Sequence, residues 1–327
     1  MRRRDFITLV GGAAAAWPLA ALAQQKSKIY RIGILETVPQ KINASNLNAL
    51  RRGLREHGYV EGKNLLIEYR SADGRGDLFP GLAAELVRLG VDLIVTRGTP
   101  AARAAKSATT TIPIVMAAIG EPLGVGVVES LARPGGNVTG LSAFVTELAG
   151  KRIELLKDAF PSISRVAFLQ NMGNPVSPPQ WEATKMVAVA LGLSSELLDV
   201  RNEQDIARAF ATAIEHKVNA MSVGIDALTQ AKADMIVELA VRHKLLSAYP
   251  SREFVEAGGL ISYGVNYPDL YYRSATLIDK IFKGTKPGNL PVEQPVKLEL
   301  IINLKTANAL GINLPPQLLA LADNVIE

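Results

Sequence analysis

The chain contains no cysteine among its 327 residues. This absence excludes disulfide bridges, thiolate metal sites and cysteine nucleophiles. It also excludes a lipid-modified cysteine at the N-terminus of a mature form. Stability must therefore come from buried apolar cores.

Long apolar runs and strong charge are missing from most of the sequence as well. Beyond residue 23, no apolar run approaches the roughly 18 residues that a membrane-spanning helix requires. The formal net charge is only +5, and no dense cluster of lysine and arginine follows the first few residues. A balance of this kind argues against nucleic acid as the partner.

Recognisable catalytic motifs are also lacking. Residues 58–64 approach a phosphate-binding loop but are one residue short and carry no serine or threonine after the lysine. Residues 140–144 lack the final glycine of a nucleophile elbow. The three histidines, His57, His216 and His243, match no metal-ligand spacing. The sequence therefore predicts no enzyme, no metal site and no cofactor.

The N-terminus has the features of an export signal. Three arginines, residues 2–4, precede a weakly apolar stretch that ends in Ala21-Leu22-Ala23, a small-x-small cleavage pattern. The segment Arg3-Arg4-Asp5-Phe6-Ile7 also fits the core of a twin-arginine signal. A membrane anchor is the alternative, but the glycines and proline in the stretch make it weakly hydrophobic. We expect a signal peptide at residues 1–23, cleaved after Ala23, and a freely diffusing periplasmic protein.

The rest of the chain alternates short apolar strands with amphipathic helices. The predicted strands of the first half are residues 29–35, 65–69, 91–96, 112–117 and 137–141. Those of the second half are residues 165–170, 195–200, 218–223, 246–249, 260–263 and 296–302. Helices are predicted between most of them, including one after residues 112–117 and a long one that ends at His243.

This alternation predicts the fold class. Strands that alternate with helices form parallel sheets with helices on both faces. Two such runs, joined near residues 141–148, predict an α/β protein of two doubly wound parallel-sheet lobes with a ligand cleft between them. The late strand at 296–302 indicates that the chain crosses between the lobes more than once. We expect lobe one to comprise residues 24–143 and about 266–290, and lobe two residues 144–265 and about 291–327.

Polar and aromatic residues gather at the ends of these strands. Ligands of open parallel sheets bind beyond the carboxyl ends of the strands. The candidate binding residues are therefore Glu36, Thr37, Thr99, Pro100, Glu121, Pro122, Ser142, Phe144, Asn171, Ser177, Asp226, Tyr249 and Tyr263.

Three of the loops share a polar residue followed by proline, at Thr99, Glu121 and Ser177. Proline suits the first turn of a helix, and helix N-termini favour anions because they carry free N–H groups and partial positive charge. We interpret the loops as helix starts, with a ligand carboxylate held at Thr99 and Glu121. Ordinary helix capping is the alternative.

Three further candidates each have two interpretations. Asp226 either pairs with an amino group of the ligand or caps the helix that follows it. Tyr249 and Tyr263 either stack on a planar ligand or belong to the core or rim.

The sequence resembles a known family over nearly the whole of the predicted mature chain. The motifs that carry the resemblance are Gly120-Glu121-Pro122, the stretch Ala132-Arg133-Pro134-Gly135-Gly136-Asn137-Val138-Thr139-Gly140, Ser262-Tyr263-Gly264, and residues 266–270 and 322–327. They are similar to those of the ABC transporter substrate-binding family that includes tryptophan/tyrosine-binding proteins of Gram-positive bacteria.

The resemblance implies a type I periplasmic-binding fold, in which hinge motion at three crossover segments closes two lobes on a ligand. It also implies an amino-acid ligand, often aromatic, and a membrane permease and cytoplasmic ATPase as partners; we expect the protein itself to be a monomer. By position it places these residues on ligand-facing loops: Thr99, Pro100, Glu121, Pro122, Ser142, Asn171 and Asp226. Glu121 departs from the aspartate that relatives commonly carry there.

Two other functions stay open. A periplasmic sensor would share the fold but pass its ligand-bound state to a membrane receptor. A hydrolase or isomerase would use Asp226 or Glu36 as a base.

Overall fold

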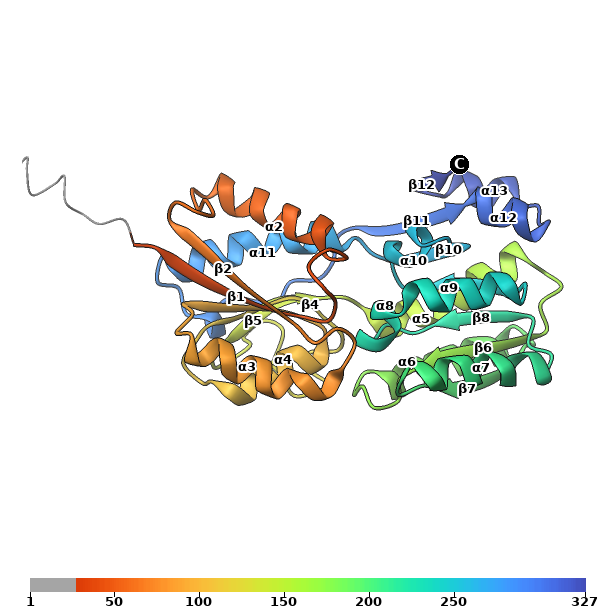
Figure 1. The fold of residues 1–327 in the computed structure, drawn as a ribbon, viewed down its shortest axis with the longest axis horizontal. Helices are drawn as coiled ribbons and strands as arrows, with labels where there is room; N and C mark the ends of the chain where they lie inside the picture. The colour runs from red at the N-terminus through yellow and green to blue at the C-terminus, as the bar shows by residue number, and fades with distance from the viewer. Residues whose placement is uncertain (1–27) are drawn as a thin grey trace, which may run out of the picture.

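The structure is a computed structural model that describes residues 28–327. The described chain forms two α/β lobes that lie side by side along the long axis of the molecule (Figure 1). The export signal predicted at residues 1–23 lies outside the described residues. Within residues 28–327, we find no helix that is both long and apolar enough to cross a membrane.

Lobe one is built on a five-stranded sheet with the strand order β2-β1-β3-β4-β5, and all neighbouring strands are parallel. Its strands are β1 (Tyr30–Glu36), β2 (Leu65–Ser71), β3 (Leu93–Arg97), β4 (Ile114–Ile119) and β5 (Val138–Ser142). One face is covered by α2 (Ala44–Glu56) and α11 (Tyr267–Phe282), and the other by α3 (Phe79–Arg88) and α4 (Thr99–Ala108), with the 3-10 turn η1 (Gly76–Leu78) before α3.

Strand sequences explain why both faces of this sheet are covered. Successive side chains of a strand point to opposite faces. In β3, Leu93 and Val95 join the apolar cluster under α2 and α11, and Ile94 joins the cluster under α3 and α4. A strand that is apolar at consecutive positions therefore requires helices on both sides.

Lobe two is built on a seven-stranded sheet with the strand order β12-β11-β10-β9-β8-β6-β7. Its strands are β6 (Arg165–Gln170), β7 (Ser194–Asp199), β8 (Ala220–Val223), β9 (Leu246–Tyr249), β10 (Ile261–Val265), β11 (Leu298–Asn303) and β12 (Asn324–Ile326). One apolar cluster includes α5 (Val145–Ala159), α6 (Ser177–Ala190), α12 (Leu304–Leu310) and α13 (Pro316–Ala320). The other includes α7 (Glu203–Glu215), α8 (Ala227–Ala231), α9 (Ala233–Arg242) and α10 (Arg252–Glu256).

The chain passes between the two sheets three times: from β5 to α5, from β10 to α11, and from the 3-10 turn η2 (Pro287–Asn289) to β11. At the start of the third passage, Glu293 forms two backbone hydrogen bonds with β5: its N–H donates to Gly140 O, and its carbonyl accepts from Ser142 N. Strand β11 then enters lobe two from the cleft end and runs antiparallel to β10. The predicted α/β architecture of two doubly wound lobes is confirmed, with the addition that β11 and its parallel neighbour β12 run opposite to the other strands of the lobe-two sheet.

Two helix predictions are wrong. The long helix predicted to end at His243 is two helices, α8 and α9, which meet at Lys232. Between β4 and β5, residues 121–137 form turns and bends instead of a helix that begins at Glu121. Glycines 126, 135 and 136 all have positive φ there, a conformation that a right-handed helix does not use.

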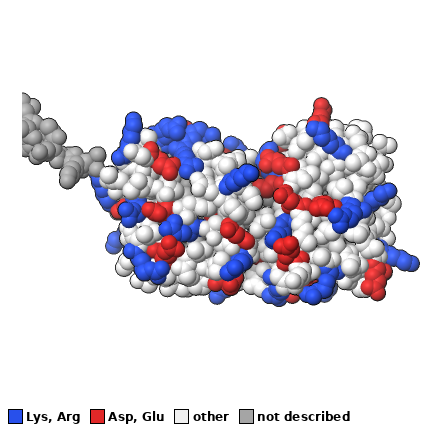
Figure 2. Space-filling view, in the orientation of Figure 1, with Lys and Arg blue, Asp and Glu red and all other residues white. Residues whose placement is uncertain are grey.

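Surface charge is mixed on the face shown in Figure 2, where basic and acidic side chains are interspersed over both lobes. Basic side chains gather at the upper left, over the part of lobe one where Figure 1 places α2. No single sign of charge dominates the view.

Candidate functional site

The carboxyl ends of the strands in the two lobes face each other and enclose an inner cavity of about 30 Å³. Lobe one contributes Thr37, Arg97 and Thr99 to its wall, and lobe two contributes Asn174 and Asp226. A larger groove of about 1120 Å³ lies outside it. The two spaces share Pro100, Asn174, Asp226 and Ala227, which therefore mark the mouth of the inner cavity.

Asp226 is the N-cap of α8 and almost fully buried. Its Oδ1 accepts hydrogen bonds from Leu228 N at 2.9 Å and Asn171 Nδ2 at 3.0 Å, and its Oδ2 accepts one from Asn174 Nδ2 at 2.9 Å. A reciprocal bond from Asp226 N to Thr229 Oγ1 completes a capping box. The capping interpretation is therefore confirmed, and the same carboxylate also lines both spaces.

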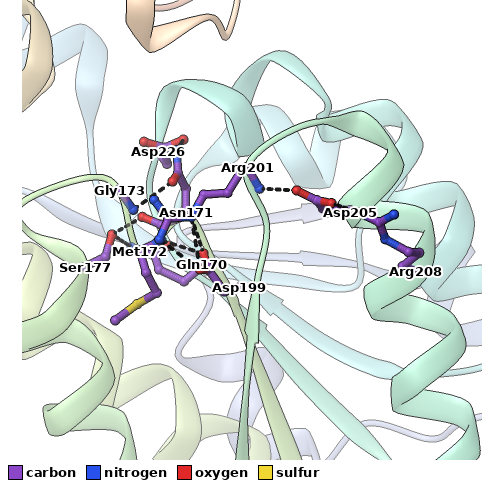
Figure 3. Close-up of polar contacts among 10 residues, drawn as sticks. All are labelled: Gln170, Asn171, Met172, Gly173, Ser177, Asp199, Arg201, Asp205, Arg208 and Asp226. Carbon is purple, nitrogen blue, oxygen red and sulfur yellow. Dashed lines mark hydrogen bonds and ion pairs between the residues drawn. The ribbon is translucent and has the colours of Figure 1, made fainter.

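The loop after β6 extends this network (Figure 3). Asn171 Oδ1 accepts from Gly173 N at 2.9 Å, and Asn171 O accepts from Ser177 Oγ at 2.7 Å. Ser177 Oγ in turn accepts from Gln170 Nε2 at 2.6 Å. The polar wall of lobe two is thus held by bonds within its own lobe.

Arg201 of lobe two lines the outer groove and already has a carboxylate partner. Its Nε lies 2.8 Å from Asp199 Oδ1, and its Nη2 lies 2.9 Å from Asp199 Oδ2 (Figure 3). This forked pairing matches the planar geometry of a guanidinium with a carboxylate.

Glu36 and Thr37 end β1 on the lobe-one side of the cleft. Thr37 Oγ1 donates across the cleft to Gln230 Oε1 of α8 at 3.1 Å. Glu36 is fully buried and accepts hydrogen bonds from Thr37 N and the Tyr271 hydroxyl. Burial is the largest influence on this carboxyl, outweighs the opposing attraction of Arg97, and raises its pKa to about 7.

Arg97 is a cleft residue that sequence reasoning missed. It ends β3 and is 3% exposed; its Nη2 donates to Glu253 Oε1 of lobe two at 3.1 Å, and its Nη1 to Asn43 Oδ1 at 3.3 Å. Its guanidinium carbon also lies 4.2 Å from the ring centre of Tyr267. The signal was a charged residue at the end of a buried strand, directly before Gly98.

Arg152 of α5 was also missed. It is 2% exposed and lines a small cavity of about 10 Å³ together with Tyr267. The sequence signal was an arginine within the apolar stripe that includes Leu148 and Leu156, which are one helical turn away on either side.

The remaining predicted residues divide into two groups. Thr99 and Pro100 begin α4 at the inner cavity, where Thr99 Oγ1 donates to Gly120 O at 3.0 Å. Tyr249 is instead fully buried in lobe two, where it stacks on Phe254 at 5.1 Å. The other predicted residues that line neither described space are Glu36, Glu121, Pro122, Ser142, Phe144, Ser177 and Tyr263.

Packing and backbone conformation explain why three of these residues, Phe144, Tyr263 and Glu121, line neither space. Phe144 and Tyr263 pack against the apolar clusters of the lobes. Glu121 has a φ of 49° in a turn, so the helix start expected to hold a carboxylate there is absent. No group of three or more histidine, aspartate or glutamate side chains within residues 28–327 could hold a metal ion.

Comparison with known proteins identifies the family. The model of the family described as "ABC transporter substrate binding protein" matches residues 31–326. A tyrosine-binding protein of Clostridioides difficile (strain R20291) is 27% identical over 277 residues, which cover 84% of this chain and 79% of that protein.

Solved structures agree with this assignment. The ABC domain in complex with L-Trp from Streptococcus pneumonia is 32% identical, with a TM-score of 0.83 over 91% of this chain and 99% of that one. A ligand-free, open substrate-binding protein with adhesive properties from Clostridium difficile is 26% identical, with a TM-score of 0.66 over the same shares. The chain therefore belongs to the ABC transporter substrate-binding protein family.

Proposed function

We propose that this protein is the solute-binding component of an ABC importer and captures an amino acid, or an aromatic amino-acid-like solute, between its two lobes. One observation carries the proposal: polar side chains of both lobes, Thr37 and Thr99 on one side and Asn174 and Asp226 on the other, line a single cavity. The names of two relatives, one tyrosine-binding and one in complex with L-Trp, support the class of solute.

Capture requires the lobes to move. A space of about 30 Å³ holds about one water molecule, whereas pockets for small molecules span roughly 300–1,000 Å³. The three passages between the sheets form the hinge about which the lobes separate. Closure would then exclude water and strengthen each polar contact with the solute.

The mouth of the cavity would hold the amino-acid head group. The N-terminus of α4, a ten-residue helix that begins at Thr99, presents free N–H groups toward a carboxylate. Asp226 at the opposite side would accept a hydrogen bond from the ammonium group. Asn171 and Asn174, both bonded to Asp226, would keep its carboxylate in place.

Export and partners belong to the same proposal. The arginines and the small-x-small pattern before residue 24 support a signal peptide cleaved after Ala23 and a periplasmic protein. The match to the substrate-binding family supports a role without enzymatic activity or cofactor. A monomer would deliver its solute to a membrane permease that an ATPase drives.

A thermal-shift panel tests the proposal on protein that is recovered from the periplasm, where its N-terminus is expected at Gln24, and stripped of bound solute. Amino acids, small aromatic acids, sugars and polyamines are compared. A solute at 100 times its dissociation constant adds about 2.7 kcal/mol, which raises the melting temperature by several degrees. Shifts with sugars or polyamines alone would contradict the amino-acid assignment.

A further inference from the structure

Two buried guanidinium groups flank Tyr267 at the inner end of the cleft. Arg97 stacks on the ring of Tyr267, and Arg152 lines the same small cavity as that ring. Both arginines are less than one-twentieth exposed. They come from different parts of the chain, one from the end of β3 in lobe one and the other from α5 in lobe two.

Both arginines carry buried N–H donors that no acceptor of the described residues reaches. Arg152 Nη1 donates to Tyr263 O at 3.2 Å, but Nε and Nη2 have no hydrogen-bond partner among the described residues. Arg97 Nε is likewise buried without a partner within residues 28–327. A buried donor without a partner destabilises the fold, and more so when it carries charge.

The nearby carboxylates do not neutralise both charges. Glu253 pairs with Arg97; burial is the largest single influence and opposes its charge, but the attraction of Arg97 and the hydrogen bonds to the carboxylate together lower the pKa of Glu253. Glu36 is held partly protonated near neutral pH, because burial raises its pKa to about 7. Burial lowers the pKa of Arg152 to about 10, so this guanidinium stays charged at pH 7. Because Glu36 is only partly ionised, part of one positive charge remains in excess.

A continuous set of residues links this charge to the mouth of the cleft. The inner cavity and the cavity beside Arg152 share Ala143, Val145, Ile225 and Tyr267. At its other end the inner cavity reaches Asp226 and Pro100. A solute whose head group lies at Asp226 would point its side chain toward Tyr267 and the two arginines.

We propose that Arg97 and Arg152 bind an acidic group on the side chain of the solute, so that the preferred solute is an amino acid that ends in a carboxylate. The inference rests on the proposed function and narrows its class of solute. A carboxylate offers several lone pairs and one negative charge, which match the unpaired donors and the excess charge. The small cavities beside the arginines widen as the lobes part to admit it.

Matched acid and amide probes test this inference. L-Glutamate is compared with L-glutamine, and 4-carboxy-L-phenylalanine with 4-carbamoyl-L-phenylalanine, by calorimetric titration of solute-stripped full-length mature protein. We expect at least one acid to bind tenfold or more tightly than its amide. Arg152→Met and Arg97→Met should each reduce that ratio to near one.

Arg103→Met is the matched control, because Arg103 is exposed and lines only the outer groove among the described spaces. It should leave the acid-to-amide ratio unchanged. Arg152→Lys keeps the charge but not the fork of donors, and should retain part of the preference even if Arg152→Met fails to fold.

A measurement without solute separates binding from structure. If Arg152 serves the solute, Arg152→Met should leave the melting temperature of the solute-free protein unchanged or raise it, because an unpaired buried charge is removed. A fall of several degrees in that protein, with an intact acid preference, would assign Arg152 a purely structural role and overturn the inference.

The remaining outcomes separate the two proposals. Binding of amino acids with equal affinity for acid and amide, or with preference for the amide, overturns the inference and leaves the proposed function standing. Binding of only amino acids with uncharged side chains, aromatic or not, does the same. Failure of every amino acid to bind overturns both.

Discussion

The two lobes present chemically different walls to the same cleft. On lobe two, Asp226 accepts three hydrogen bonds from its own lobe, and the loop after β6 is held by further bonds within that lobe. On lobe one, Thr37 bonds across the cleft to Gln230, and Arg97 bonds across it to Glu253 as well as to Asn43 of its own lobe. The polar wall of lobe two is therefore preformed, whereas some hydrogen bonds of the lobe-one wall form only when the lobes close.

This difference indicates which lobe orients the solute and which lobe controls opening and closing. A wall whose polar groups are already bonded stays in one geometry and can position a head group repeatedly. A wall whose groups bond to the opposite lobe loses those bonds on opening and exchanges them for water or solute. We infer that lobe two fixes the orientation of the solute, and that the charged end of lobe one sets the balance between open and closed forms.

The largest effect expected from this contrast is a pH dependence that originates in lobe one. The pKa of Glu36 is raised from about 4.5 to about 7 on folding, so the folded protein retains a proton that the unfolded chain releases. Its contribution to stability is complete below pH 4.5 and is lost as the pH rises toward 7, by up to about 3 kcal/mol. Urea unfolding at pH 5 and pH 8 should show this loss in the wild type and a smaller one in Glu36→Gln.

An exposed carboxylate of lobe two provides the control for this measurement. Glu215→Gln, at the end of α7, should leave the difference between pH 5 and pH 8 as in the wild type. If Glu36→Gln kept the pH dependence of the wild type, the assignment of that dependence to Glu36 would be wrong. The two lobes would then not differ in the pH dependence of their buried charges.

A change in the preformed wall should have the next largest effect. Asp226→Ala removes an N-cap, worth about 1 kcal/mol, and leaves the amides of Asn171 and Asn174 without their acceptor. We expect a loss of roughly 2 kcal/mol or more of stability, and amino-acid binding weakened more than tenfold if the carboxylate meets the ammonium group. Thermal unfolding and titration calorimetry measure the two effects separately.

Asp226→Asn is the matched variant, because it keeps an acceptor for the cap but loses the charge. It should retain most of the stability and still bind the solute poorly. Full affinity in both variants would leave Asp226 as a cap alone and would place the head group elsewhere.

The smallest effect concerns the neutral bond between the lobes. Thr37→Val removes the donor to Gln230, and Gln230→Met removes the acceptor. A double-mutant cycle in urea should give a coupling of about 0.5–1.5 kcal/mol. Additive effects would show that this contact does not couple the lobes in solution.

Sequence patterning predicted much of the fold because local periodicity follows directly from burial. Strands β6 and β9 coincide with their predicted ranges, and most other strands lie within a few residues of theirs. The rule that ligands bind beyond strand ends brought Thr37, Thr99 and Asp226 to one cavity. The predicted helix after β4 is wrong, because Gly126, Gly135 and Gly136 adopt a positive φ that a right-handed helix does not use.

The sequence by itself thus determined the two lobes and the strand ends that face the cleft, and it left capping as one of two roles for Asp226, because each of these depends on residues close together in the chain. Only the tertiary structure decided the partners of the buried charges. Arg97 meets Glu253 across 156 positions of sequence, Arg152 lies beside Tyr267, and Tyr249 lies in a core instead of the cleft. The period of a strand determines which face of the sheet a side chain lies on. The electrostatic partner of that side chain depends instead on how distant segments of the chain, and the two lobes, pack against each other.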